Sequence, residues 1–250
     1  MRIELLLIGD ELLTGELDPY PSKIAGSIRG KGASLSRITI VPDSVRDIVL
    51  ELDAACSRGA DLVLVTGGLG PTIDDVTRHA LAAFLGKELV IDPEARSWME
   101  EALVRRHGRR PKASSAAMLM AMVPQGTEAL RNRAGVACGI KAVLGRTIII
   151  CVPGFPGEML AMFEEHFLPL VRREGQTERV FHVKRRETTM EPIFQAIAKQ
   201  YGVRIASLPK EDWREGGNVV VIKGPEEEVD QASKAFLEMV ERSRDEWEDE

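Results

Sequence analysis

Short runs of hydrophobic residues alternate along the first part of the chain with segments whose hydrophobic residues recur every three or four positions. Residues 3–8 and 62–65 form short apolar runs, a pattern typical of strands buried on both faces of a parallel sheet. Residues 20–29 and 44–57 have the helical spacing, and residues 35–41 alternate polar and apolar side chains as a strand does. The order predicts a three-layer α/β/α domain with a mixed, mostly parallel sheet.

The remaining pattern predicts where this domain ends and a second one begins. After a glycine-rich loop we expect helices at 74–85 and 93–106, extended segments at 118–123 and 142–152 with a hairpin turn at 144–147, and a last helix at 157–171. Residues 172–178 are polar and are interpreted as a linker. Beyond it we expect a strand to 186, a helix at 192–201, strands at 203–208 and 218–223, and a helix at 226–240. The prediction is a large domain at 1–171 and a small α+β domain at 179–250 with an acidic tail.

The composition narrows the classes of partner. The 250-residue chain has a net charge of −6, which argues against a nucleic-acid binder, because such proteins neutralise phosphates with a basic surface. No apolar stretch approaches the roughly 20 residues that span a bilayer, and the apolar start is too short for a signal peptide. Cys56, Cys138 and Cys151 are too widely spaced for a disulfide framework or a zinc site. We expect a cytoplasmic homo-oligomer, a dimer or trimer, that binds a small ligand and neither nucleic acid nor membrane.

One dense basic run, residues 105–112, has two interpretations. Its basic side chains could meet phosphate groups, or they could be the solvated end of a helix and the loop after it. The second interpretation is the more common one for a charge run.

A glycine-rich loop between an expected strand and an expected helix is the strongest candidate site. Glycine lets the backbone turn tightly and approach a ligand, and free amides at a helix N-terminus attract an anion. The loop therefore predicts a phosphate site, with a plain tight turn as the alternative. It has neither the Gly-Lys-Ser/Thr of a P-loop nor the GxGxxG of a dinucleotide fold. The predicted ligand-binding residues are Thr66, Gly67, Gly68, Gly70, Pro71 and Thr72.

Carboxylates follow this loop and the first two expected strands. Asp74 and Asp75 would repel a bare phosphate, so we expect a divalent cation, Mg²⁺, Mn²⁺ or Co²⁺, between them and the ligand. Asp10 follows the first strand, at the sheet edge where α/β proteins bind ligands, and completes the predicted metal set of Asp10, Asp74 and Asp75. Asp43, after the second strand, joins these three as a candidate catalytic residue. Capping of a turn or helix is the alternative for each of the four.

Further loop residues are expected to wall the same pocket, since each lies in a turn-rich segment beside a predicted strand. They are Gly9, Glu11, Thr14, Asn132, Gly135, Gly139, Pro153, Gly154, Pro156 and Glu158. The four histidines have no mutual spacing typical of a zinc site, so we expect structural or surface roles for them.

Four motifs, taken in order, resemble one family. GDELLTG at 9–15, TGGLGPTIDDVT at 66–77, the loop at 132–139 and PGFPGEM at 153–159 resemble the CinA-type competence/damage-inducible family. The resemblance covers Met1 to about Val171 and implies that family's amino-terminal domain, which is similar to the molybdopterin-binding proteins MoaB, MogA and MoeA. Residues 179–240 resemble the small middle domain of longer members. No counterpart of their amidase domain is expected, and hence no deamidation of nicotinamide mononucleotide.

The chain also departs from the motifs of similar proteins. Residues 135–139 are Gly-Val-Ala-Cys-Gly where those proteins usually show Gly-Thr-Ala-Pro-Gly, and Met120 stands in place of a glutamine. A hydroxyl and an amide are thereby lost from the expected pocket wall.

The resemblance implies a metal-dependent pyrophosphatase that hydrolyses ADP-ribose or a related dinucleotide to AMP and a sugar phosphate. Asp43 and Asp75 match aspartates of the molybdopterin-binding relatives. In the expected mechanism the glycine loop holds the diphosphate, the metal polarises a phosphoryl oxygen and helps generate hydroxide, and Asp43 or Glu11 aligns the attacking water. Two alternatives stay open: a molybdopterin-binding protein of molybdenum cofactor biosynthesis, and a non-catalytic nucleotide-binding or regulatory protein.

Overall fold

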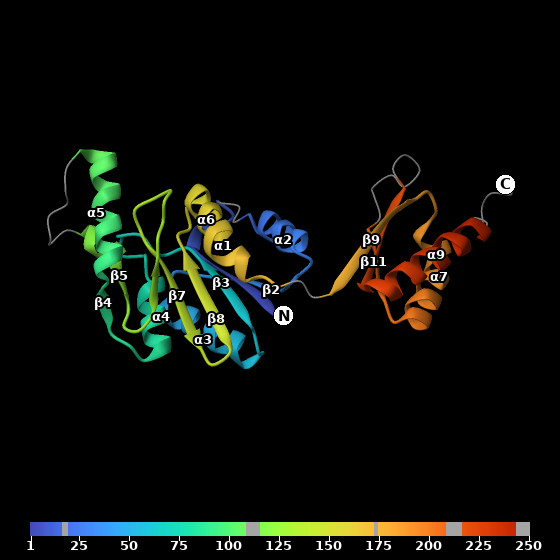
Figure 1. Ribbon diagram of the computed structural model, residues 1–250, viewed down its shortest axis with the longest axis horizontal. Helices are drawn as coiled ribbons and strands as arrows, with labels where there is room; N and C mark the ends of the chain where they lie inside the picture. The colour runs from blue at the N-terminus through green and yellow to red at the C-terminus, as the bar shows by residue number, and fades with distance from the viewer. Residues whose placement is uncertain (17–19, 109–115, 173–174, 209–216, 244–250) are drawn as a thin grey trace. The chain divides into compact units, whose positions relative to one another are not determined.

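The computed structural model describes residues 1–16, 20–108, 116–172, 175–208 and 217–243. The chain divides into two compact units, Met1–Arg172 and Arg173–Glu250 (Figure 1). Each unit has its own hydrophobic core, so each is described by itself.

Six strands of the first unit's described residues form one sheet, in the order β2-β1-β3-β8-β7-β6. The first four of these, β2 (Leu35–Val41), β1 (Ile3–Ile8), β3 (Leu62–Thr66) and β8 (Thr147–Val152), pair in parallel. The other two, β7 (Gly139–Leu144) and β6 (Glu128–Leu130), are antiparallel to their neighbours. The predicted mixed, mostly parallel sheet is confirmed.

Helices cover both faces of this sheet because every residue of β1 is buried and successive side chains point to opposite faces. Leu6 and Ile8 pack in one cluster with α3 (Val45–Ser57), α4 (Thr77–Leu85) and α5 (Pro93–His107). Leu5 and Leu7 pack in the other with α2 (Pro21–Gly30), α6 (Pro156–Met162), the π-helical turn Phe163–Phe167 and the 3₁₀ turn Leu168–Leu170. The predicted three layers are thus present (Figure 1).

Two predictions for this unit are wrong and one is confirmed. The segment 118–123 is not a strand throughout, since Ala116–Ala121 is a 3₁₀ helix and only Met122–Pro124 is strand β5, paired with β4 (Leu89–Ile91). Its methionines are buried, and a short apolar run does not distinguish a strand from a buried helical turn. The helix predicted from residue 74 begins at Thr77, and a short helix α1 (Asp10–Thr14) was not predicted. The hairpin between β7 and β8 is confirmed.

The second unit is a three-stranded antiparallel sheet with two helices. Its sheet has the order β10-β11-β9, formed by β9 (Gln176–Val183), β10 (Arg204–Leu208) and β11 (Asn218–Pro225). The helices α7 (Glu187–Tyr201) and α9 (Glu226–Arg242) pack on it through one shared core. β9 begins inside the segment predicted as a linker. The helix predicted from Pro192 begins earlier, at Glu187, so Pro192 lies inside α7. The acidic tail beyond Ser243 lies outside the described residues.

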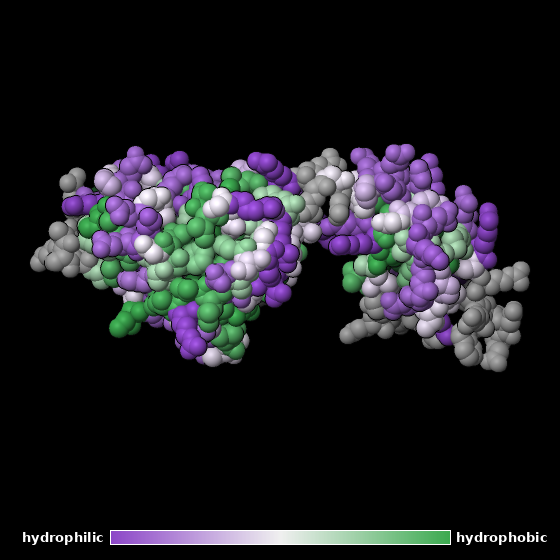
Figure 2. Space-filling model, turned by 90° about the horizontal axis from the view of Figure 1, so that it is seen from below, coloured by the Kyte–Doolittle hydropathy of each residue, from purple (hydrophilic) through white to green (hydrophobic). Residues whose placement is uncertain are grey.

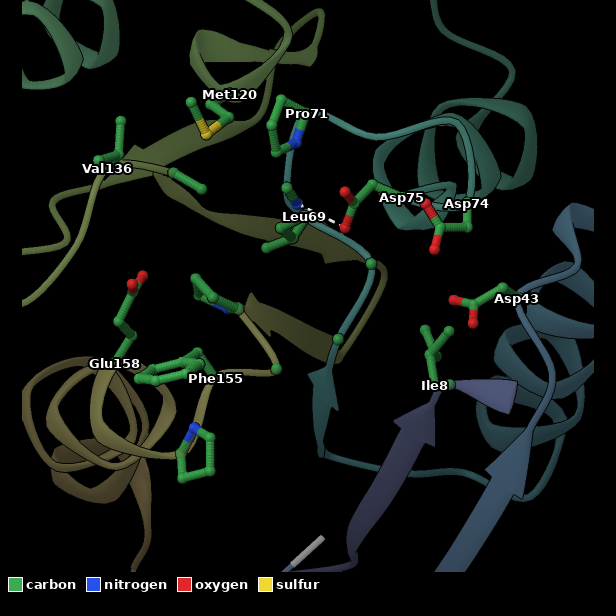
Figure 3. Close-up of a pocket in the computed structure, with 18 of the residues that line it drawn as sticks. Ile8, Asp43, Leu69, Pro71, Asp74, Asp75, Met120, Val136, Phe155 and Glu158 are labelled. Atoms are coloured by element: carbon green, nitrogen blue, oxygen red, sulfur yellow. Dashed lines mark hydrogen bonds between the residues drawn. The ribbon is translucent and has the colours of Figure 1, made fainter. Parts of the chain in front are cut away.

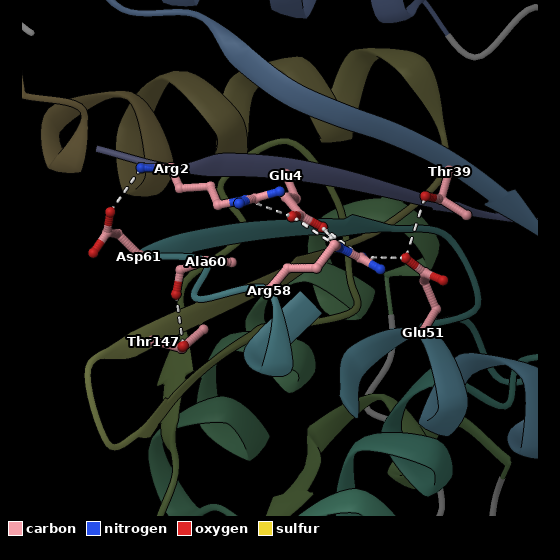
Figure 4. Close-up of polar contacts among 8 residues, drawn as sticks. All are labelled: Arg2, Glu4, Thr39, Glu51, Arg58, Ala60, Asp61 and Thr147. Atoms are coloured by element: carbon pink, nitrogen blue, oxygen red, sulfur yellow. Dashed lines mark hydrogen bonds and ion pairs between the residues drawn. The ribbon is translucent and has the colours of Figure 1, made fainter. Parts of the chain in front are cut away.

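A buried charged group lies near the start of β1, at the opposite end of that strand from Gly9. Glu4 is only 3% exposed, and it accepts hydrogen bonds from Arg58 Nη2 at 2.6 Å and Arg2 Nε at 3.2 Å (Figure 4). Arg58 also pairs with Glu51 of α3, which accepts from the Thr39 hydroxyl of β2. Burial raises the pKa of Glu4, but the hydrogen bonds and positive charges of Arg58 and Arg2 outweigh it and leave that pKa below its usual range. The network joins β1, β2 and α3.

Some large hydrophobic side chains remain exposed on the first unit, among them Leu50, Val143 and Phe155. Figure 2 shows one face of that unit on which hydrophobic residues gather between hydrophilic ones. Such faces are common in contact surfaces, and the expected dimer or trimer stays a prediction. None of the helices within the described ranges is long and apolar enough to cross a membrane.

Candidate functional site

A cavity of about 700 Å³ opens where the parallel strands end. Its walls come from the segments that follow β1, β2, β3 and β8, together with residues of α5, of the 3₁₀ helix Ala116–Ala121 and of the loop before β7 (Figure 3). In open α/β sheets ligands bind outside the carboxyl ends of the strands, so the cavity lies where the fold predicts a site.

The cavity brings together thirteen of the predicted site residues. They are Gly9, Glu11, Asp43, Gly67, Gly68, Gly70, Pro71, Asp74, Asp75, Pro153, Gly154, Pro156 and Glu158. The other predicted residues do not line it: Asp10, Thr14, Thr66, Thr72, Asn132, Gly135 and Gly139.

The glycine loop after β3 has a backbone that requires glycine at two successive positions. Gly67 and Gly68 have φ values of +102° and +64°, a region that side chains other than glycine rarely adopt. An added Cβ would overlap the carbonyl oxygen of Ile8 at Gly67 and the hydroxyl of Thr77 at Gly68. The loop therefore lies directly on the end of β1 and the start of α4.

The carbonyl groups of this loop are held by the first two residues of α4. Thr77 donates from its hydroxyl to Gly67 O at 2.7 Å and from its amide to Gly68 O at 3.1 Å. Arg78, only 1% exposed, donates from Nη1 to Gly70 O at 2.8 Å and from Nη2 to Leu69 O. Within the described residues, the amides of Gly68 and Leu69 have no hydrogen-bond acceptor. Both residues line the cavity.

Burial sets the protonation of the groups behind this loop. Burial lowers the pKa of the Arg78 guanidinium, which nevertheless stays charged, as guanidinium groups in proteins do. Burial raises the pKa of the Cys138 thiol to about 11. Cys138 is therefore a neutral, buried side chain rather than a nucleophile.

The Asp75 side chain closes the glycine loop by accepting hydrogen bonds from two residues of that loop. Its Oδ1 accepts from the amide of Gly70 at 2.7 Å, and its Oδ2 accepts from the amide of Thr72 at 2.8 Å and from the Thr72 hydroxyl. The expectation that Gly70 and Thr72 donate to a ligand therefore needs correction, because Asp75 takes these donors. The capping interpretation describes Asp75 in part: it caps the turn before α4.

Asp43 lies among other acidic groups at the rim of the cavity. Its Oδ2 accepts from the amide of Asp10 at 3.0 Å, while Asp10 Oδ1 accepts from the amide of Asp43 at 3.4 Å. Burial, and the negative charges of Glu11, Asp10 and Asp74, raise the pKa of Asp43. The carboxylates of Asp43 and Asp74 point toward one another in Figure 3. Asp43 does not cap α3, since the N-cap is Ser44.

The predicted metal ligands are not gathered into one set. The described residues hold no group of three or more histidine, cysteine, aspartate or glutamate side chains arranged to bind a metal ion. Asp75 uses both oxygens within the loop, Asp10 lies outside the cavity lining, and Asp74 is exposed. A hydrogen bond from the Thr72 side chain and one from its own amide lower the pKa of Asp74.

The loop at 132–139 is fixed to the first turn of α6 by a hydrogen bond. Asn132 Nδ2 donates to Ala137 O at 3.0 Å and to Glu158 Oε2 at 2.7 Å, and its Oδ1 accepts from the amide of Ala134. An added Cβ at Gly135 would overlap the carboxylate of Glu158. Asn132 and Gly135 therefore position Glu158, which lines the cavity.

Eight residues outside the predicted set also line the cavity: Ile8, Leu69, Leu103, Arg106, Met120, Val136, Ala137 and Phe155. Of these, Met120 and Val136 were expected in the pocket wall as departures from the motifs of similar proteins. Leu103 belongs to the helix α5, where the pattern indicates only core and solvent faces, whereas Arg106 lies in the basic run 105–112, for which contact with phosphate groups was one of two interpretations. Phe155 is 72% exposed, and an aromatic residue in a turn-rich loop was a signal that could have been used. Arg78 gave no signal, because arginine in a helix is usually exposed.

Comparisons with known proteins agree with this fold. A family model described as "Probable molybdopterin binding domain" matches residues 4–173. A Pyrococcus furiosus protein is 35% identical over 216 residues, 84% of this chain and 86% of the relative. A CinA-like protein of Geobacter metallireducens is 35% identical over 212 residues, 84% of this chain but 49% of the relative. The crystal structure of CinA from Thermoplasma acidophilum, of unknown function, is similar with a TM-score of 0.58 and 27% identity over 66% of this chain and 94% of that one.

Proposed function

Since the chain belongs to the molybdopterin-binding domain family, with relatives of the CinA type, we propose that its Met1–Arg172 unit binds a phosphorylated pterin in the cavity beside β1, β3 and β8. One observation carries the proposal: the amides of Gly68 and Leu69 have no acceptor among the described residues and belong to a loop that lines this cavity. Backbone amides beside a helix N-terminus are a common binding site for phosphate.

The rest of the cavity suits a flat heterocycle with N–H groups. Leu69, Met120 and Phe155 supply apolar and aromatic surface, on which a planar ring can stack. Asp43 and Asp74 supply acceptors at the rim, and carboxylates accept hydrogen bonds from ring and exocyclic amino groups. A pterin presents such donors at one end and carries its phosphate at the other.

Calorimetry of the whole chain with molybdopterin and, separately, with ADP-ribose tests the proposal. We expect molybdopterin to bind more tightly, and Gly68→Ala to weaken it at least tenfold, because the substitution displaces the loop. Gly86→Ala, at a glycine of the same φ with open space around it, is the control. Binding of ADP-ribose without binding of molybdopterin would contradict a pterin ligand.

A metal-dependent pyrophosphatase acting on ADP-ribose is the second candidate. The facing carboxylates of Asp43 and Asp74 favour it (Figure 3). The predicted metal set of Asp10, Asp74 and Asp75 does not fit, however, because Asp75 is occupied and Asp10 lies outside the cavity lining. We therefore derive no hydrolytic step, and hydrolysis stays a prediction.

Incubation of the pure protein with ADP-ribose and each of Mg²⁺, Mn²⁺ and Co²⁺ distinguishes the hydrolase from the non-catalytic, regulatory protein. AMP formed by the wild-type chain and not by Asp43→Asn would support the hydrolase. ADP-ribose that binds and is recovered unchanged would instead support the non-catalytic, regulatory alternative.

A further inference from the structure

A second cavity, of about 520 Å³, adjoins the first. The two share Arg106, Val136, Phe155 and Glu158 in their linings. A ligand long enough to pass these shared residues can therefore occupy both spaces at once.

The two cavities have opposite charge. Five carboxylates and one arginine line the first, whereas three arginines and one carboxylate line the second. The arginines are Arg105, Arg106 and Arg133, and the carboxylate is Glu158, which already accepts a hydrogen bond from Asn132. The second cavity is thus the part of this site that favours an anion.

A positive charge is favourable at the C-terminal end of a helix without any ligand, but this effect explains only two of the three arginines. Arg105 and Arg106 lie in the last turn of α5, where a positive charge is favourable. Arg133 comes from a separate loop after β6, and it faces the same cavity although Glu165 is its ion-pair partner at 3.1 Å. Among the described residues, Arg106 has no acidic partner of its own. The helix end does not account for the convergence of two segments on one cavity.

We propose that the second cavity is an oxyanion site that holds a distal phosphate of an elongated ligand, past Phe155 from the glycine loop. The proposal rests on the proposed function, because the ligand's first phosphate is taken to bind at Gly68 and Leu69. Guanidinium groups suit this role because their fixed fork of donors matches phosphate oxygens. Phe155, shared by both cavities and 72% exposed, lies where the planar part of such a ligand would stack. The preferred ligand carries two phosphate groups and a planar ring system.

Calorimetry with adenosine 3′,5′-bisphosphate and with AMP tests the second site. We expect the wild-type chain to bind the bisphosphate at least tenfold more tightly than AMP, and the double variant Arg106→Gln, Arg133→Gln to lose that preference. Arg96→Gln is the control for loss of a positive charge, because Arg96 lies on the same helix as Arg106 but outside both cavities.

Several outcomes would overturn the proposal. They are equal binding of the two nucleotides by the wild-type chain, no binding of either, a preference kept by the double variant, or the same loss in Arg96→Gln. Molybdopterin titrated into the same proteins separates this failure from failure of the proposed function. If molybdopterin binds the wild-type chain while the bisphosphate shows no preference, only the second site is refuted.

Discussion

The carboxylates of Asp10 and Asp43 each accept a hydrogen bond from the other residue's backbone amide, at 3.4 and 3.0 Å. The exchange joins the segments that follow β1 and β2, although 33 residues separate them in the chain. It also holds two negative charges beside Glu11 and Asp74, which together with burial raise the pKa of Asp43. The rim of the cavity thus keeps a charge repulsion, which the N–H donors of the proposed pterin would relieve.

Asp43→Asn is expected to stabilise the protein by up to about 1 kcal/mol at neutral pH, because it removes a like charge and keeps an oxygen for the Asp10 amide. The folded pKa of Asp43 is raised, so its ionised form destabilises the fold above that pKa. The gain from the substitution should fade as the pH falls through that pKa toward the ordinary value of about 3.9. Urea unfolding of both proteins at pH 7 and pH 4 measures it. Asp53→Asn, which removes an exposed charge from α3, should change little; a gain that persists at pH 4 would contradict the repulsion.

Asp75→Asn is expected to lower the free energy of unfolding by about 2 kcal/mol, since an amide offers one acceptor oxygen where the loop needs two. Affinity for molybdopterin should fall at least tenfold, because the loop loses its closure at Gly70 or Thr72. Urea unfolding and calorimetry give the two values. The neighbouring variant Asp74→Asn leaves that closure intact and should unfold like the wild-type chain. Wild-type stability in Asp75→Asn would show that the loop does not depend on these bonds.

Gly68→Ala and Gly86→Ala compare two glycines with the same φ of +64°. The left-handed conformation alone costs an alanine about 1 kcal/mol, and that is the expected loss for Gly86→Ala, whose added Cβ meets open space. The Cβ at Gly68 would overlap the Thr77 hydroxyl, so we expect a loss of about 3 kcal/mol there. Thermal or urea unfolding of both variants gives the difference, and equal losses would mean that the contact with Thr77 is relieved without cost.

Glu4→Gln is expected to destabilise the protein by about 2 kcal/mol at pH 7, because the partly buried Arg58 then keeps only Glu51 as an acidic partner. The folded pKa of Glu4 is lowered, so the wild-type advantage is present above the ordinary glutamate value of about 4.3 and is lost as the pH falls through the folded pKa. Unfolding measured from pH 7 down to pH 3 follows this convergence. Glu128→Gln breaks an exposed pair with Lys141 and should cost less than about 1 kcal/mol.

Patterning along the chain was enough to predict most elements of the first unit. Strand β2 has the predicted bounds of 35–41, although its apolar Ile38 and Ile40 are exposed rather than in the core. Helix α5 begins at the predicted Pro93, where the Asp92 side chain accepts from the amide of Ala95. The helix expected from residue 74 failed for a local reason: the Asp75 side chain accepts from the amides of Gly70 and Thr72 and holds residues 70–75 in a turn, and α4 starts only at Thr77.

The position of the cavity was predictable, but the hydrogen bonds of its residues were not. Glycines and acids after strands indicated the sheet edge at which the cavity opens. The sequence could not show that the Asp75 side chain would turn back onto Gly70 and Thr72, nor that Arg78 would be buried with its guanidinium on the loop carbonyls. Both depend on side-chain conformations that only the packed fold selects.

Gly154 lies against Gly67, and a Cβ added to it would come 3.1 Å from the Gly67 Cα. The backbones of the segments after β3 and β8 are therefore in direct contact. Ligand preference cannot be redesigned by exchanging one of these segments from a relative, because its neighbour would no longer fit. Both segments have to be exchanged together, and only the exposed Phe155 can be substituted without changing the other segment.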